Sequence, residues 1–167
     1  MQLPVMDAND AGLWYAGGLK FRCTCCGNCC TGPTGYVWVS DEEIHKLADH
    51  LGEPEVEVRR RFVRKIGKRQ SFKERREPNG DYDCVFLKPL PGDDPNGKRV
   101  RGCSIYEVRP LQCRTWPFWD GLLDEPESWD SAAEHCPGMN RGKSYDVEHI
   151  ERMRTADEWP NEPPSSK

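Results

Sequence analysis

The sequence predicts a small α+β protein, a single loop-rich domain in which short helices and short strands are organised around a cysteine metal site. The chain has 167 residues, of which 36% are hydrophobic, and its mean hydropathy is −0.84. A chain of this kind has room for one modest apolar core. The sequence also holds 9 cysteines, 14 prolines and 15 glycines. Small loop-rich chains with many cysteines usually gain stability from disulfides or from metal.

The clearest helical signals in the sequence begin at Ser40. The segment from Ser40 to Glu43 has the S-x-x-E pattern of a capping box, in which two side chains satisfy backbone amides at a helix start. Apolar residues follow at helical spacing as far as Leu51, and Gly52 is a stop signal. We therefore expect a helix over residues 41–51.

A second helix is predicted from Pro54, because Val58, Phe62 and Ile66 share one helical face and Gly67 is a stop signal. The other elements are predicted from turn residues and short apolar runs. They are a strand over 36–39, two strands over 71–87 joined at the Pro78–Asp81 turn, a polar loop over 88–102, a short helix after Ser104 and a last helix over 145–158.

The chain divides by composition into four segments. Residues 1–20 are expected to be an irregular lead-in, 21–140 a cysteine-cluster metal-binding domain, 141–158 a helix packing on that domain, and 159–167 a disordered tail. The first residues lack the basic and apolar regions of a signal peptide, and no window approaches the ~20 apolar residues of a transmembrane helix. We therefore expect a cytoplasmic protein, whose reducing environment favours metal over structural disulfides.

The cysteines form one cluster and four isolated positions. The cluster lies in the stretch FRCTCCGNCC, where C-x-x-C spacing lets two thiolates reach one metal from a tight turn. Cys25 is the extra cysteine of this stretch, and we expect it to be dispensable. The eight sulfurs divide either into two four-sulfur sites or into one larger assembly. The expected metal ligands are Cys23, Cys26, Cys29, Cys30, Cys84, Cys103, Cys113 and Cys136.

The spacing favours an iron–sulfur cluster over zinc as the cofactor. Structural zinc is usually bound by two paired C-x-x-C segments, and this chain has one such segment. The triple run C-x-x-C-x-x-C is similar to the spacing in bacterial ferredoxins, which ends in Cys-Pro, and Cys136–Pro137 supplies such a pair at a distance. We expect one or two metal centres. An iron–sulfur cluster is the preferred expectation for the cofactor, and zinc is the second.

Four stretches of the chain carry a resemblance to a known family. They are Phe21-x-Cys23-x-x-Cys26-Gly27-x-Cys29-Cys30, Cys84-x-Phe86-Leu87, Gly102-Cys103-x-Ile105-Tyr106-Glu107-x-Arg109-Pro110-x-x-Cys113-Arg114-x-x-Pro117-Phe118 and Cys136-Pro137-Gly138. Over about residues 21–140 the chain resembles the CxxCxxCC (YkgJ-type) cysteine-cluster family, described as a zinc- or iron-chelating domain with eight characteristic cysteines. The resemblance implies that these eight cysteines are the ligands.

The chain departs from the family pattern at three places, none of which removes a ligand. Cys25 is extra, Val85 stands where a proline commonly follows the fifth family cysteine, and the 88–102 loop is long. The family name has also been tied to flagellin N-methylase, a lysine methyltransferase whose larger chain includes this domain. We expect no separate catalytic domain here, so the resemblance implies flagellin N-methylase-like features through the shared domain alone.

Two arginines beside the cysteines are candidates for supporting the cofactor. Arg109 and Arg114 are expected to offset the negative charge of a thiolate-bound centre and to donate hydrogen bonds to sulfur, although arginines at such positions also serve as surface or capping residues. His135 is adjacent to a cysteine, but eight sulfurs leave it little reason to bind metal. No catalytic residue can be assigned from the order of the residues.

Two functions of different classes remain open at this point. In the first, the chain is a metal-cluster protein with a redox or accessory-enzyme role. In the second, the metal is structural zinc, and the basic stretch 59–76 (ten basic residues and one acidic) contacts a protein or nucleic-acid partner. Most charge runs of this kind are solvated helix faces. The net charge of −4 also disfavours nucleic acid and membrane, so metal is the expected partner, with a protein second.

Overall fold

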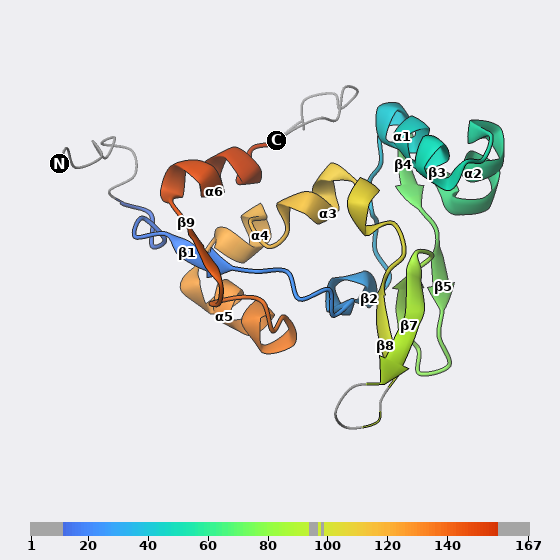
Figure 1. The fold of residues 1–167 in the computed structure, drawn as a ribbon. Helices are drawn as coiled ribbons and strands as arrows, with labels where there is room; N and C mark the ends of the chain where they lie inside the picture. Colours follow the sequence, from blue (N-terminus) through green and yellow to red (C-terminus); the bar gives the residue numbers. More distant parts are fainter. Residues whose placement is uncertain (1–11, 94–96, 98, 157–167) are drawn as a thin grey trace. The chain divides into compact units, whose positions relative to one another are not determined.

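The computed structural model is of a mixed α+β protein, as the sequence predicts, with short helices and short antiparallel strands (Figure 1). The structure describes residues 12–93, 97 and 99–156, so the expected tail and the first part of the expected lead-in lie outside the described residues. The described chain forms two compact units. Unit 1 comprises the residues up to Thr24 together with Thr115–Ala156, and unit 2 comprises Cys25–Arg114.

Helix α1 (Asp41–Leu51) of unit 2 confirms the first predicted helix. Its capping box is complete, because the Ser40 hydroxyl accepts from the Glu43 amide at 3.2 Å and the Glu43 carboxylate accepts from the Ser40 amide at 2.8 Å. Gly52 ends the helix in the left-handed conformation, with φ of 64°. The local signals in this segment therefore decide its structure.

Helix α2 (Glu55–Phe62) is shorter than the sequence predicts. The segment expected to continue the helix is strand β3 (Val63–Ile66), which forms an antiparallel hairpin with β4 (Arg69–Phe72). Val63 pairs with Phe72 across this hairpin, and β-branched residues such as valine and isoleucine favour strands. Strand pairing thus overrides the helical spacing of Phe62 and Ile66.

The other strands of unit 2 form two antiparallel arrangements. Strands β2 (Thr31–Gly32), β6 (Tyr82–Cys84) and β5 (Glu74–Arg76) form one sheet, in which the predicted turn joins β5 to β6. Strands β7 (Leu87–Asp93) and β8 (Arg99–Cys103) form a hairpin. The prediction of a polar loop over 88–102 is therefore wrong, because these residues extend and pair despite their prolines and glycines.

The core of unit 2 lies against α1, α2 and the strands. Helix η3 (Tyr106–Val108) and helix α3 (Leu111–Thr115) follow β8, in the region where a short helix is predicted. The side chains of Cys84 and Cys103 pack against the core. Its buried members are Val39, Ile44, Leu47, Ala48, Val58, Phe72, Phe86 and Ile105.

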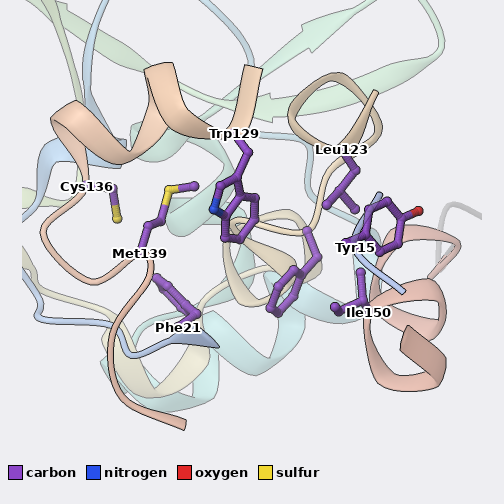
Figure 2. Close-up of a cluster of buried hydrophobic side chains, with 8 residues drawn as sticks. Tyr15, Phe21, Leu123, Trp129, Cys136, Met139 and Ile150 are labelled. Carbon is purple, nitrogen blue, oxygen red and sulfur yellow. The ribbon is translucent and has the colours of Figure 1, made fainter. Parts of the chain in front are cut away.

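Unit 1 combines one small strand pair with three helices. Strand β1 (Leu19–Phe21) pairs with β9 (Lys143–Tyr145), and the helices are α4 (Asp120–Leu123), α5 (Pro126–His135) and α6 (Val147–Arg154). Helix α6 lies in the region of the last predicted helix. Figure 2 shows the core of this unit, with the Trp129 indole in its middle and the Cys136 side chain at one end. Its members are Tyr15, Phe21, Phe118, Leu123, Trp129, Cys136, Met139 and Ile150.

Among the described residues, no helix combines the length and the apolar character needed to cross a lipid bilayer.

Candidate metal centre

The cysteine-rich stretch turns sharply at Gly27 and then forms a single helical turn. Gly27 has a φ of 74°, and a Cβ atom there would lie 2.7 Å from the Leu87 side chain and 3.2 Å from the Arg101 carbonyl oxygen. Only glycine fits this close approach without strain. The turn that follows is η2 (Asn28–Cys30), closed by a 2.9 Å hydrogen bond from the Cys30 amide to the Gly27 carbonyl.

Five cysteines from four elements of unit 2 act on one another electrostatically. Two come from η2, one from the end of β6, one from the end of β8 and one from α3. The charge on each thiolate disfavours ionisation of its neighbours, and such an influence acts between groups in the same part of the unit. The five are Cys29, Cys30, Cys84, Cys103 and Cys113.

Burial is the main factor that holds two of these thiols in the neutral form. Burial raises the pKa of the Cys113 thiol, and the thiols of Cys84, Cys29 and Cys103 raise it further. Burial also raises the pKa of Cys84 to about 11, and the Cys103 and Cys29 thiols again add to the effect. A bound cation favours the thiolate, so metal binding at this cluster releases protons.

Cys29 and Cys30 form a vicinal pair with different acidities. Their sulfur atoms lie 3.8 Å apart. The hydrogen bond from Cys30 is the main cause that lowers the pKa of Cys29 to about 7, and the same bond raises the pKa of Cys30. Cys29 is the exposed member of the pair, and its pKa is lowered whereas those of Cys30, Cys84 and Cys113 are raised, which makes it the first of these four to present a thiolate to a metal ion.

Arg109 supplies a positive charge near the five cysteines. Its charge lowers the pKa of both Cys29 and Cys113, although other causes act on these thiols more strongly. The guanidinium lies 3.6 Å from the centre of the Tyr106 ring, and its Nε donates to the Tyr106 carbonyl at 2.9 Å. Arg114 differs, because its Nε donates to the Arg109 carbonyl and its terminal nitrogen lies 3.8 Å from the Glu43 carboxylate.

Helix α3, which carries Cys113, is held by three hydrogen bonds of two side chains, and the sequence did not predict these bonds. The amide of Leu111 donates to the Glu43 carboxylate at 2.6 Å, and Glu43 is only 7% exposed. The side-chain oxygen of Gln112 accepts from the Trp38 amide at 2.8 Å, while its nitrogen donates to the Tyr36 carbonyl at 3.0 Å. The capping box singles out Glu43, but no local signal indicates its second contact.

Comparison with known proteins identifies a family for which metal chelation is described. The family model CxxCxxCC, described as "Putative zinc- or iron-chelating domain", matches residues 22–137. The chain belongs to this family. It is also similar to the "Uncharacterized protein MJ0661" of Methanocaldococcus jannaschii, with 35% identity over 104 residues. This match covers 62% of the chain and 48% of the relative, so it extends over about half of the relative's length. No solved structure matches the chain.

The CxxCxxCC match includes all nine cysteines, so four of them are outside the group of five. Cys136 is buried in the core of unit 1, and Cys23 packs against that core. Cys26 is half-buried in unit 2. Cys25 is exposed and has a φ of 56°, an uncommon conformation for a residue other than glycine.

The donor set fits the soft metals that the family description names. All nine cysteines of this CxxCxxCC protein are thiols in the structure. Sulfur ligands select zinc and iron–sulfur clusters over magnesium or calcium, which prefer oxygen. Within the described ranges, no three His, Cys, Asp or Glu side chains stand in an arrangement ready to bind an ion. Coordination therefore requires the clustered thiols to turn toward a common point. His135 is exposed, and its Nδ1 lies 3.2 Å from the Ser131 carbonyl.

Proposed function

We propose that this protein holds an iron–sulfur cluster in unit 2 and has a redox or accessory-enzyme role. The observation that carries the proposal is the grouping of five thiols beside one arginine. Such a cluster supplies one-electron chemistry when bound, and its potential depends on hydrogen bonds and charges around the sulfurs. Arg109 would set that environment, because its positive charge acts on two of the five thiols. The proposed ligands are Cys29, Cys30, Cys84, Cys103 and Cys113.

Two features of the chain support iron–sulfur over zinc. A structural zinc ion usually takes its ligands from two paired segments, whereas this group consists of one vicinal pair and three single positions. The C-x-x-C-x-x-C run that leads into the pair is also the spacing of cluster-binding ferredoxins. We extend the proposal to Cys23, Cys26 and Cys136 as further ligands, which metal-to-protein ratios in their serine variants test.

Structural zinc is the second candidate, and the vicinal pair favours it. Two thiolates bound at about 2.3 Å to one tetrahedral ion stand about 3.8 Å apart. The Cys29 and Cys30 sulfurs are separated by 3.8 Å, so a single ion can take both without moving them apart. In this case the protein is a binding module rather than a redox protein.

We also propose a cellular compartment and a kind of reaction for this protein. Nine cysteines that form no disulfide support a reducing compartment, and we place the protein in the cytoplasm on that ground. An accessory role in methyl transfer is the more specific form of the proposal, and its support is the link between this family's name and flagellin N-methylase. Electron transfer is the more general form.

The deciding experiment is elemental analysis of anaerobically purified protein, with a visible absorption spectrum taken before and after exposure to air. The proposal expects iron and inorganic sulfide, with colour that fades in air. Cys113→Ser should lose most of the iron, whereas the matched variant Cys25→Ser should keep it. A colourless protein with stoichiometric zinc would replace the first candidate with the second. Loss of colour in Cys25→Ser alone would show that the ligand set is wrong.

A further inference from the structure

Asp83 is a buried carboxylate in the sheet that leads to Cys84, and it has no part in the site as described so far. The residue is only 1% exposed. It lies on β6, the central strand of the β2–β6–β5 sheet, where it stands opposite Thr31 on one side and Arg75 on the other. An ionised carboxylate is costly to bury unless hydrogen-bonding or charged groups face it. The partners of Asp83 therefore indicate its role.

Side chains from three other strands reach this carboxylate. The Thr31 hydroxyl donates to its Oδ1 at 2.6 Å, and the Arg101 guanidinium donates to its Oδ2. A terminal nitrogen of Arg75 lies 4.0 Å from Oδ2 and donates to the Leu87 carbonyl at 3.0 Å. Asp83 thus joins β2, β5 and β8 to β6, and Arg75 extends the connection to β7.

Three of these strands adjoin cysteines of the group of five. Thr31 directly follows the vicinal pair of η2, and β6 ends one position after Asp83, at Cys84. Strand β8 ends at Cys103, two positions after Arg101 and on the same face of the strand. One buried carboxylate therefore connects the segments that carry four of the five thiols.

The turn before the vicinal pair packs against the same network. A Cβ atom at Gly27 would lie 3.2 Å from the Arg101 carbonyl oxygen and 2.7 Å from the Leu87 side chain. The side chain of Arg101 donates to Asp83, and the carbonyl of Leu87 accepts from Arg75. The turn that leads into η2 thus rests on residues that the Asp83 network holds in place.

We propose that Asp83 is a positioning residue of the metal centre. The inference rests on the proposed binding of metal by the five thiols. Because the carboxylate ties the ends of three strands to one buried point, it holds the backbone of four ligands in place before an ion arrives. Only the side chains then have to turn toward the metal. A site organised in this way loses less conformational freedom on binding, so its affinity is higher.

The test is anaerobic titration of metal-free protein with cobalt(II), whose thiolate complexes absorb by sulfur-to-metal charge transfer with an intensity that follows the number of bound thiolates. Asp83→Ala should bind cobalt about 10- to 100-fold more weakly than the wild type, the range typical for loss of a residue that supports metal ligands. Asp83→Asn keeps an oxygen that accepts from Thr31, so its affinity should lie between the two.

The contact with the vicinal pair is tested on its own at Thr31. Thr31→Val removes the hydroxyl that donates to Asp83 and should weaken cobalt binding, whereas Thr31→Ser keeps a hydroxyl and should bind as the wild type does. This pair of variants also carries the test if Asp83→Ala does not fold. Equal affinity in the two Thr31 variants would overturn the inference.

Val58→Ala is the matched control for a general loss of stability. Val58 is fully buried on α2, in the core of unit 2. Its truncation should lower stability toward urea while cobalt affinity stays close to that of the wild type. Circular dichroism of each metal-free variant verifies that it is folded.

The outcomes separate this inference from the metal site on which it rests. Wild-type affinity and band intensity in folded Asp83→Ala would overturn the inference alone. Equal losses of affinity in Asp83→Ala and Val58→Ala would also overturn it, since they would show an effect of stability only. Absence of a thiolate band in the wild type, or an unchanged band in Cys113→Ser, would overturn the five-thiol site and the inference with it.

Discussion

The two units of this protein bury their cysteines in different ways. In unit 1 Cys136 lies inside a core of aromatic and aliphatic side chains, where the Trp129 ring stacks near Phe118 with centroids 6.0 Å apart. In its thiol form, a buried single cysteine of this kind packs as a small hydrophobic residue. In unit 2 five cysteines from different elements affect one another's ionisation beside an apolar core.

Apolar packing therefore surrounds the cysteine of unit 1, whereas unit 2 contains a group of thiols that a metal would stabilise. The Trp129 indole donates to the Asn140 side chain at 2.8 Å, so its one polar group is satisfied within unit 1. In unit 2, burial and neighbouring thiols raise the pKa of Cys113, which lowers the stability of its thiolate form until a cation binds. We therefore expect the two units to respond differently to metal.

The largest expected effect is from Cys113→Ser or from complete metal removal, which would destabilise unit 2 far more than unit 1. The free energy of metal binding becomes folding free energy, so we expect a loss of about 5 kcal/mol or more in unit 2. Hydrogen exchange measured by mass spectrometry separates the amides of Cys25–Arg114 from those of unit 1. Equal loss of protection from hydrogen exchange in both units would contradict the expected difference between them. Unchanged thermal melting after metal removal would contradict it as well.

Trp129→Ala is the matched variant for unit 1. Trp129 is 2% exposed, and removing a large buried aromatic side chain typically costs about 3–5 kcal/mol. We expect faster exchange in the amides of unit 1 and retention of the metal that the five thiols of unit 2 hold. Loss of that metal in this folded variant would show that the two units do not respond independently.

A smaller effect is expected from Glu43→Ala, which tests how α3 is held. The change removes half of the capping box of α1 and leaves the buried Leu111 amide without its acceptor, which together should lower stability by about 2–3 kcal/mol. Release of metal to a chelator should also accelerate, because α3 carries Cys113. Glu43→Gln keeps an accepting oxygen and should restore part of both properties.

The matched control for this position is Glu42→Ala. Glu42 is exposed and pairs with Lys46 on the same helix, so its loss should leave stability and metal release as in the wild type. If folded Glu43→Ala released metal at the wild-type rate, Glu43 would be a residue that stabilises α1 alone.

The smallest expected effect is a pH dependence confined to unit 1. Burial and the 2.5 Å hydrogen bond to Glu151 raise the pKa of Tyr15 from 10.0 to about 12. The unfolded chain therefore loses this proton first, so the stabilisation is complete below pH 10 and is lost as the pH rises to about 12. We expect a loss of about 1–2 kcal/mol across this range. Tyr15→Phe should flatten that part of the curve, and an unchanged curve would argue against the shift.

The elements that the sequence predicts correctly are those with signals close together in the chain. Helix α1 has its capping box, its apolar spacing and its terminal Gly52 within 13 positions, from Ser40 to Gly52. Helix α5 is absent from the predictions, because Trp129 is its one fully buried residue and no apolar stripe marks it. The β7–β8 hairpin was also missed, because Pro89 and Gly92 suggest a loop, yet proline is tolerated in an edge strand.

The sequence alone indicates that this protein binds metal through sulfur, because the number and spacing of cysteines are local properties of the chain. It indicated soft-metal binding and the family to which the chain belongs. The tertiary structure shows which thiols lie in the same part of unit 2 and which contacts hold the helix that carries Cys113. Cys84 and Cys113 come together from a strand and a helix, and Glu43 reaches the Leu111 amide across 68 positions. Local signals act over a few residues, whereas contacts at such separations depend on how the elements pack.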